Sequence, residues 1–149
     1  MKQRALVAGV VLSLLAAAPA WGQPIRQFRG HHAPVSAVAF APDGQSLASA
    51  SFDHSIKVWD VPRGAVVQTL AGHRDTVLTL AYTADGRRLV SAGTDGQVLV
   101  WDAVTGAALH RHRFPCKALC AAFTPDGRHV GTGTGQAVCY LMELPRHIR

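Results

Sequence analysis

Histidine, serine and aspartate recur twice in the same order along the chain, and together they can support nucleophilic catalysis. The two sets are His31, Ser49 and Asp53, and then His73, Ser91 and Asp95. In such a triad, the histidine takes the proton of the serine hydroxyl and the aspartate orients the imidazole. The Gly-x-Ser-x-Gly turn that exposes the nucleophile in one large class of hydrolases surrounds neither serine. A hydrolase that uses Ser49 or Ser91 is thus one interpretation of these residues, and it competes with a purely structural role.

The remaining reactive side chains do not form a recognisable metal or cofactor site. Histidines occur in pairs at positions 31 and 32 and at positions 110 and 112, but His31 already belongs to one of the two sets, and His110 and His112 would share one strand face and could point to solvent. The three cysteines, at positions 116, 120 and 139, lack the spacing of a zinc knuckle or a haem attachment site. We expect them to be buried in apolar surroundings. The sequence predicts no metal and no cofactor.

The positive charge of the chain is spread along it rather than gathered in one place. The formal net charge is +6, from 15 Lys and Arg residues against nine Asp and Glu residues. The densest basic spots are Arg87-Arg88 and His110–Arg113. A nucleic-acid-binding protein is expected to concentrate its basic residues in a patch or stripe. We therefore predict no binding to nucleic acid.

The two sets of polar residues are separated by one repeat of the sequence. The stretch FDHSIKVWD at residues 52–60 returns as TDGQVLVWD at residues 94–102, 42 residues later. A third copy follows after another 41 residues, but GQAVCYLME at residues 135–143 replaces the Trp-Asp stretch there. Self-similarity at a period of roughly 20–50 residues predicts a repeat architecture.

Each copy contains short apolar runs that are separated by Asp-Gly and other turn residues. The expected strands cover residues 35–40, 46–51, 55–60 and 66–70, then 77–82, 87–93, 97–102 and 108–112, and finally 118–123, 129–134 and 138–144. Asp-Gly is a strong signal for a tight hairpin turn. A four-stranded antiparallel unit that recurs in this way is a blade, and blades around an axis form a propeller. The predicted fold is all-β, a partial β-propeller of about three blades.

This pattern resembles the WD-repeat β-propeller family, whose repeat of about 40–45 residues carries Gly-His early and Trp-Asp late. Here Gly30-His31 and Gly72-His73 supply the first pair, and Trp59-Asp60 and Trp101-Asp102 supply the second. The resemblance covers residues 24–145 and is strong for two copies. In the third copy, Phe114 stands at the position of Gly-His.

The resemblance implies that the repeated polar residues form a structural hydrogen-bond network instead of a catalytic site. The members are His31, Ser49, Asp53 and Trp59 in the first copy, and His73, Ser91, Asp95 and Trp101 in the second. The physical chemistry agrees, because a buried indole N–H needs an acceptor and a buried carboxylate needs donors. We therefore predict that the protein is not an enzyme.

The domain boundaries follow the repeat. Residues 23–149 form the WD-repeat domain, with copies at about residues 30–71, 72–112 and 113–145. Residues 25–29 precede the first copy as a fourth strand would, and we predict a lone outer strand there that completes the third blade. Three blades are fewer than the usual four to eight of a closed ring. The chain could then join a homo-oligomeric ring, stand as an open arc, or be a degenerate or truncated fragment of a larger propeller without independent function.

Residues 1–22 are typical of a secretory signal peptide. A short basic start is followed by an uncharged apolar run at residues 5–18 and then by small residues. We expect cleavage after Gly22, or alternatively after Ala20. The run is short for a membrane span, which needs about 20 apolar residues. The sequence therefore predicts a secreted or periplasmic protein without membrane attachment after cleavage.

The loops that enter each blade and the turns after each second strand should lie at one rim. The family resemblance implies that this rim binds protein partners. The candidate contact residues are His32, Phe52, His54, Arg74, Asp75 and Thr94. Phe52 stands out because its counterpart in the next copy is Thr94, and aromatic and arginine side chains dominate binding hot spots. We predict a non-enzymatic, protein-binding scaffold.

Overall fold

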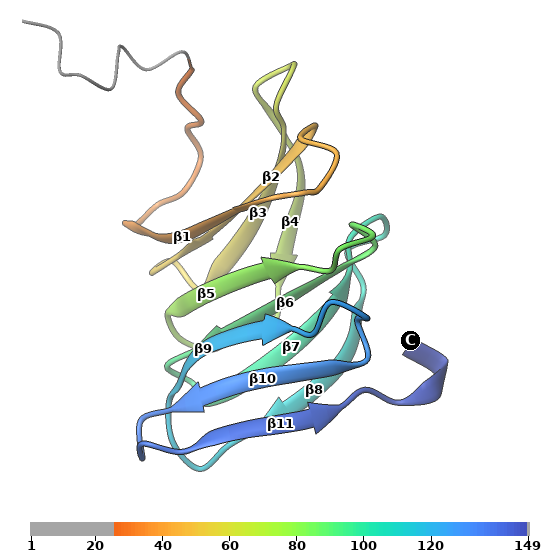
Figure 1. The fold of residues 1–149 in the computed structure, drawn as a ribbon. Helices are drawn as coiled ribbons and strands as arrows, with labels where there is room; N and C mark the ends of the chain where they lie inside the picture. The colour runs from red at the N-terminus through yellow and green to blue at the C-terminus, as the bar shows by residue number, and fades with distance from the viewer. Residues whose placement is uncertain (1–25, 149) are drawn as a thin grey trace, which may run out of the picture.

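The computed structural model describes residues 26–148, so the predicted signal peptide lies outside the described residues. The chain forms three antiparallel sheets that stack one behind another (Figure 1). Blade 1 consists of β1 (Val35–Phe40), β2 (Ser46–Ser51), β3 (Ser55–Asp60) and β4 (Ala65–Ala71). Blade 2 consists of β5 (Val77–Tyr82), β6 (Arg88–Gly93), β7 (Gln97–Asp102) and β8 (Ala108–Arg113). Blade 3 consists of β9 (Ala118–Phe123), β10 (His129–Thr134) and β11 (Cys139–Glu143). The prediction of an all-β fold built from propeller blades is confirmed.

The Asp-Gly pairs form the turns between the first and second strand of each blade. In blade 1, the Gly44 N–H donates to the Ala41 carbonyl at 2.9 Å, and the Asp43 carboxylate accepts the Gln45 N–H at 2.8 Å. Gly44 has a φ of 68°, in the left-handed region that glycine adopts without a steric penalty. The same turn recurs in blades 2 and 3, where the glycines are Gly86 and Gly127. A short local signal therefore fixes the first hairpin of every blade.

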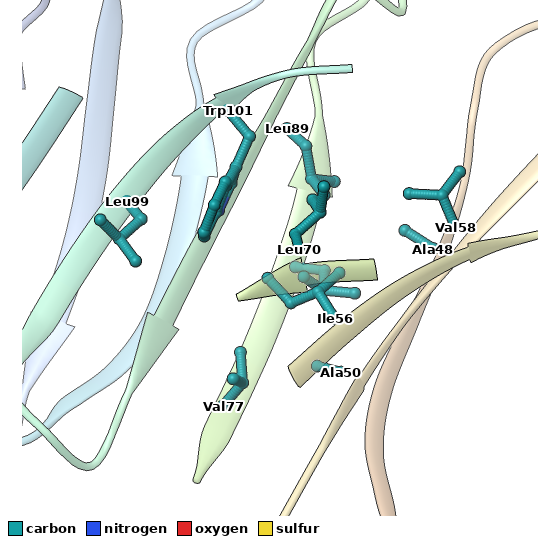
Figure 2. Packing of buried hydrophobic residues seen from close by; sticks show 10 residues of the cluster. Ala48, Ala50, Ile56, Val58, Leu70, Val77, Leu89, Leu99 and Trp101 are labelled. Carbon is teal, nitrogen blue, oxygen red and sulfur yellow. The ribbon is translucent and has the colours of Figure 1, made fainter. Parts of the chain in front are cut away.

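Two apolar layers hold the three sheets together. The layer between blades 1 and 2 contains Ala48, Ala50, Ile56, Val58 and Leu70 on one side and Val77, Leu80, Leu89, Leu99 and Trp101 on the other (Figure 2). The layer between blades 2 and 3 contains Val90, Ala92, Val98, Val100, Phe114, Ala118, Ala121, Val130 and Leu144. Strand residues alternate between the two faces of a sheet, so both faces of blade 2 are buried. The first strands β1, β5 and β9 lie beside one another (Figure 1).

The outer faces of the two end blades have no further sheet against them among the described residues. On blade 1, Val38 is 60% exposed and Phe40 is 62% exposed. On blade 3, Leu141 is 69% exposed. Inside the chain, the positions that match Val38 and Phe40 are Leu80 and Tyr82, which pack against the preceding blade. The arc therefore ends in two different apolar faces.

The described part of the predicted lone strand, residues 26–29, forms no strand, and blade 3 has three strands instead of four. This segment lies against blade 1 instead. The Arg26 guanidinium donates to the Val61 carbonyl at 2.6 Å, and the Phe28 ring meets the Trp59 ring edge-on at 5.5 Å between centroids. The prediction that the segment completes blade 3 differs from the structure because the two end blades of an open arc are not neighbours. A short 3-10 helix, η1 (Arg146–Ile148), follows β11.

The cysteines are not buried as expected. Cys120 and Cys139 are exposed and Cys116 is half-buried, and all three are free thiols. Cys120 and Cys139 both pair with Gly133 of the central strand, so they share one face of blade 3. That face points away from blade 2, where a further blade would cover it. The sequence pattern indicated a buried face, and the end of the arc leaves that face open.

Candidate functional site

The four polar residues of blade 2 form one continuous hydrogen-bonded chain. The Trp101 indole N–H donates to the Ser91 hydroxyl at 2.8 Å, and this hydroxyl lies 2.8 Å from Nε2 of His73. Nδ1 of His73 lies 3.1 Å from both carboxylate oxygens of Asp95. One arrangement of protons satisfies every group: Ser91 donates to a neutral His73, and His73 donates to Asp95. Strands β6 and β7 and two loops are tied together by this chain.

Blade 1 repeats the arrangement with the corresponding residues. The Trp59 indole N–H donates to the Ser49 hydroxyl at 2.8 Å, and this hydroxyl lies 2.7 Å from Nε2 of His31. Nδ1 of His31 lies 2.8 Å from the Asp53 carboxylate. The structure therefore brings together all eight residues that the sequence analysis placed in the two networks.

Each aspartate is also held by donors from both sides of its turn. Burial opposes the ionisation of Asp95, but the backbone N–H groups of Arg74 and Gln97, together with His73, outweigh it and lower the pKa of the carboxyl. Asp53 is similar: burial is outweighed by the hydroxyl and N–H of Ser55, the N–H of His32 and the ring of His31, so its pKa is also lowered. Both carboxylates are therefore ionised anchors of the loop rim.

The serines in these networks are not placed for attack on a substrate. Ser91 is 0% exposed and Ser49 is 4% exposed. Each hydroxyl oxygen already accepts an indole N–H, which engages one of its two lone pairs. A catalytic serine has to reach the scissile carbonyl beside an oxyanion hole. This geometry supports a structural role for both networks.

The free energy of unfolding is expected to fall as the pH drops below 6.5, the ordinary histidine pKa. Burial lowers the pKa of His73, and Arg111 lowers it further, although Asp95 acts in the opposite direction. The unfolded chain therefore takes up a proton at a higher pH than the folded chain, and acid favours unfolding. A second loss is expected below 3.8, the ordinary aspartate pKa, because the pKa of Asp95 is lowered in the fold. Urea unfolding at a series of pH values measures both losses. A His73→Asn variant should show a smaller change of the unfolding free energy with pH just below pH 6.5. An unchanged pH dependence would contradict the attribution of this loss to His73.

Blade 3 has no such network. The Thr132 hydroxyl, at the position of the network serine, donates instead to the Cys120 carbonyl at 2.8 Å. Phe114 replaces the histidine and packs against Tyr140 of β11, with ring centroids 4.8 Å apart. Phe114 is 6% exposed. An aromatic contact therefore fixes the loop that enters blade 3, where the other two blades use a chain of hydrogen bonds.

The rim residues that the sequence analysis proposed for partner binding lie on the loops beside the networks. The Phe52 ring is 48% exposed in the turn between β2 and β3. His54, with a φ of 69°, places its Nε2 atom 4.0 Å from the carboxylate of Asp75, which links the rims of blades 1 and 2. The Thr94 hydroxyl donates to the Thr76 carbonyl at 3.3 Å. The backbone amides of His32 and Arg74 are held by the network aspartates, and the Arg74 side chain is exposed.

Two adjoining clefts open beside this rim, which the sequence analysis did not find. The larger has a volume of about 560 Å³ and the smaller about 360 Å³, and Asp95 and Arg113 line both. The basic run at residues 110–113 was the only signal for them in the sequence. No group of three or more His, Cys, Asp or Glu residues is arranged to hold a metal ion in residues 26–148. No helix in the same residues is long and apolar enough to cross a membrane.

Comparisons with known proteins agree with this geometry. The family model for the WD domain, G-beta repeat, matches residues 22–60 and 64–102. The chain is 49% identical over 47 residues to Ribosome assembly protein 4 of Saccharomyces cerevisiae, which covers 32% of this chain and 9% of that protein. It is 48% identical over 42 residues to Pre-mRNA-processing factor 17 of the same organism, which covers 28% of this chain and 9% of the relative.

The fold is similar to that of a solved propeller as well. The β-propeller domain of Cps50 (Swd1) from Myceliophteria thermophila superposes with a TM-score of 0.72 and 25% sequence identity, over 75% of this chain and 36% of that one. The chain thus spans about a third of this propeller and a much smaller share of the curated relatives. The two matched repeats, which agree with the blades and their repeated networks, show that the chain belongs to the WD domain, G-beta repeat family.

Proposed function

We propose that the protein is a non-enzymatic scaffold that binds a protein partner through the loop rim of blades 1 and 2. The observation that carries this proposal is the Phe52 ring, which is 48% exposed in a turn where blade 2 has Thr94. Aromatic and arginine side chains are enriched at binding hot spots, and Arg74 is also exposed, on the loop that enters blade 2. The networks beneath hold both loops in place, so the rim is organised before a partner arrives. The names of the two relatives above, an assembly protein and a processing factor, are in keeping with such a role.

A Phe52→Ser variant is expected to lose a captured partner because a central aromatic anchor contributes about 2 kcal/mol or more to binding. The measurement is affinity capture with the purified chain as bait, followed by quantitative mass spectrometry. Val104→Ser is the matched control, since Val104 is 76% exposed but lies in the turn between β7 and β8, outside the rim. Partners that persist with Phe52→Ser and disappear with Val104→Ser would overturn the proposed rim.

Two further proposals rest on particular features of the chain. The basic and apolar pattern of residues 1–22 supports export from the cytoplasm. Mass spectrometry of the mature N-terminus tests this proposal, and an uncleaved chain in the cytoplasm would contradict it.

The open apolar faces of blades 1 and 3 support assembly of copies into a ring. A solution mass equal to that of one folded chain at every concentration would contradict assembly.

A further inference from the structure

Four cationic side chains line the two adjoining clefts beside the rim of blade 2. Two of them, Arg111 and Arg113, belong to β8. Lys117 lies in the loop after β8, and Arg74 lies in the loop before β5. None of the four forms a salt bridge with a described residue. The two carboxylates in the clefts are already engaged. Asp95 belongs to the network, and Asp75 accepts the Thr76 N–H and lies near His54.

Strand β8, which carries two of these cations, is an open sheet edge. It pairs only with β7 among the described residues, and five of its six residues are exposed. The Phe114 N–H donates to the Gly96 carbonyl at 2.8 Å just beyond the strand. Because the backbone of an antiparallel edge strand alternates in direction, the N–H and C=O groups of Arg111 and Arg113 point outward. The edge therefore presents free backbone groups at the residues that carry the charge.

Protection of the edge against aggregation does not by itself account for these cations. Charged side chains do guard exposed sheet edges in many proteins. The equivalent outer strand of blade 1, β4, has the sequence AVVQTLA and carries no charge at all. Cations from two separate loops, Arg74 and Lys117, also converge on the clefts beside β8. A positive surface built from three segments around a free strand edge has the features of a binding site.

We propose that an extended, acidic segment of a partner protein binds along β8, adding a strand to blade 2 and placing its carboxylates in the two clefts. Main-chain hydrogen bonds supply affinity in this mode of recognition, and the side-chain pockets supply specificity. This inference rests on the proposed protein-binding function and names the chemistry of a partner segment. A peptide fits better than a nucleic acid because the outward N–H and C=O groups of β8 can pair with the backbone of another strand, which a sugar-phosphate backbone cannot provide.

The test uses the purified chain and a short synthetic peptide in which glutamate alternates with valine. Binding is expected by titration calorimetry and should weaken with added salt, because the charges are exposed. The double variant Arg111→Glu, Arg113→Glu should bind at least about tenfold more weakly. The control is the double variant Arg63→Glu, Arg128→Glu, which changes the net charge equally on exposed residues of blades 1 and 3 and should bind as the wild type does.

The chemistry of the peptide separates the parts of the proposal. Replacing glutamate by glutamine should weaken binding because the clefts then hold no carboxylates, and methylating alternate backbone nitrogens should weaken it if a strand is added. Equal loss in the two charge variants, or equal binding of the methylated peptide or of a single-stranded RNA of matched charge, would overturn the proposal. Far-UV circular dichroism verifies that each variant is folded. If the peptide does not bind but Phe52→Ser still loses captured partners, only this inference is overturned. If the peptide binds but Phe52→Ser has no effect on capture, only the proposed partner-binding rim is overturned.

Discussion

Replacing Trp101 by alanine is expected to lower the free energy of unfolding by about 3–5 kcal/mol, the range for large-to-small changes of a buried aromatic residue. Trp101 is 2% exposed and lies in the apolar layer between blades 1 and 2 (Figure 2). Its ring sits directly against Gly72, where an added Cβ would lie 2.7 Å from a ring carbon. The substitution also takes the indole N–H away from Ser91. The loss is large beside a typical domain stability of about 5–15 kcal/mol.

The matched comparison is Trp59→Ala, which removes the same side chain and the same hydrogen bond from blade 1. Trp59 is also 2% exposed, but its ring is covered by the short segment that holds Phe28 and Gly30 rather than by another sheet. This cover can collapse or admit water, so a smaller loss of roughly 2–3 kcal/mol is expected. Urea unfolding of both variants gives the comparison. Equal losses would show that the layer between the blades is no more constraining than the end of the arc.

The second large effect is expected for Gly96→Ala, in the turn between β6 and β7. Gly96 has a φ of 74°, where an L-residue pays about 1–2 kcal/mol. A Cβ there would also lie 2.6 Å from the Phe114 carbonyl oxygen and 2.7 Å from the Cys116 carbonyl oxygen. These are backbone atoms, so the loop that leads into blade 3 has to move. Together the strain and the displacement should cost about 3–5 kcal/mol, measured as a shift of the urea midpoint.

Gly44→Ala provides the control for backbone strain alone. Gly44 has a similar φ of 68°, but no atom lies within 4 Å of an added Cβ. The expected loss is about 1–2 kcal/mol. If the two variants were equally destabilised, the contact of the loop with Gly96 would carry no energy. His54 and Ala137 occupy the corresponding turn position in the other blades at φ values of 69° and 60°, so a side chain is compatible with the turn itself.

The polar networks could be predicted from the sequence because they depend on a repeated spacing. His73, Ser91, Asp95 and Trp101 recur at the interval of their counterparts in blade 1, and the strands that carry them follow a simple alternation. The contact between Phe114 and Tyr140 could not be predicted in this way. It exists in one blade only, so no second copy shows which residues belong together. The sequence revealed the loss of the network in blade 3 but not its replacement.

The position of residues 26–29 could not be predicted from the sequence, because it depends on the curvature of the stacked blades. Pairing with β11 required the two ends of the arc to meet, and the curvature of three stacked sheets is the sum of many packing contacts. Contacts of Arg26 and Phe28 with blade 1 are local by comparison. The cationic clefts were missed for a related reason. The basic run in β8 was visible, but Arg74 and Lys117 join it only through the fold.

The unlike end faces of the arc give the molecule a polarity. Any contact between copies that uses both faces is head-to-tail, because the face with Val38 and Phe40 differs from the face with Leu141. Every copy that is added presents the same two ends again, so growth stops only when a ring closes. A closing ring gives one mass that saturates with concentration, whereas an arc of the wrong angle gives polymers whose length rises with concentration. The angle between neighbouring blades therefore determines whether assembly would give a closed ring or a fibre.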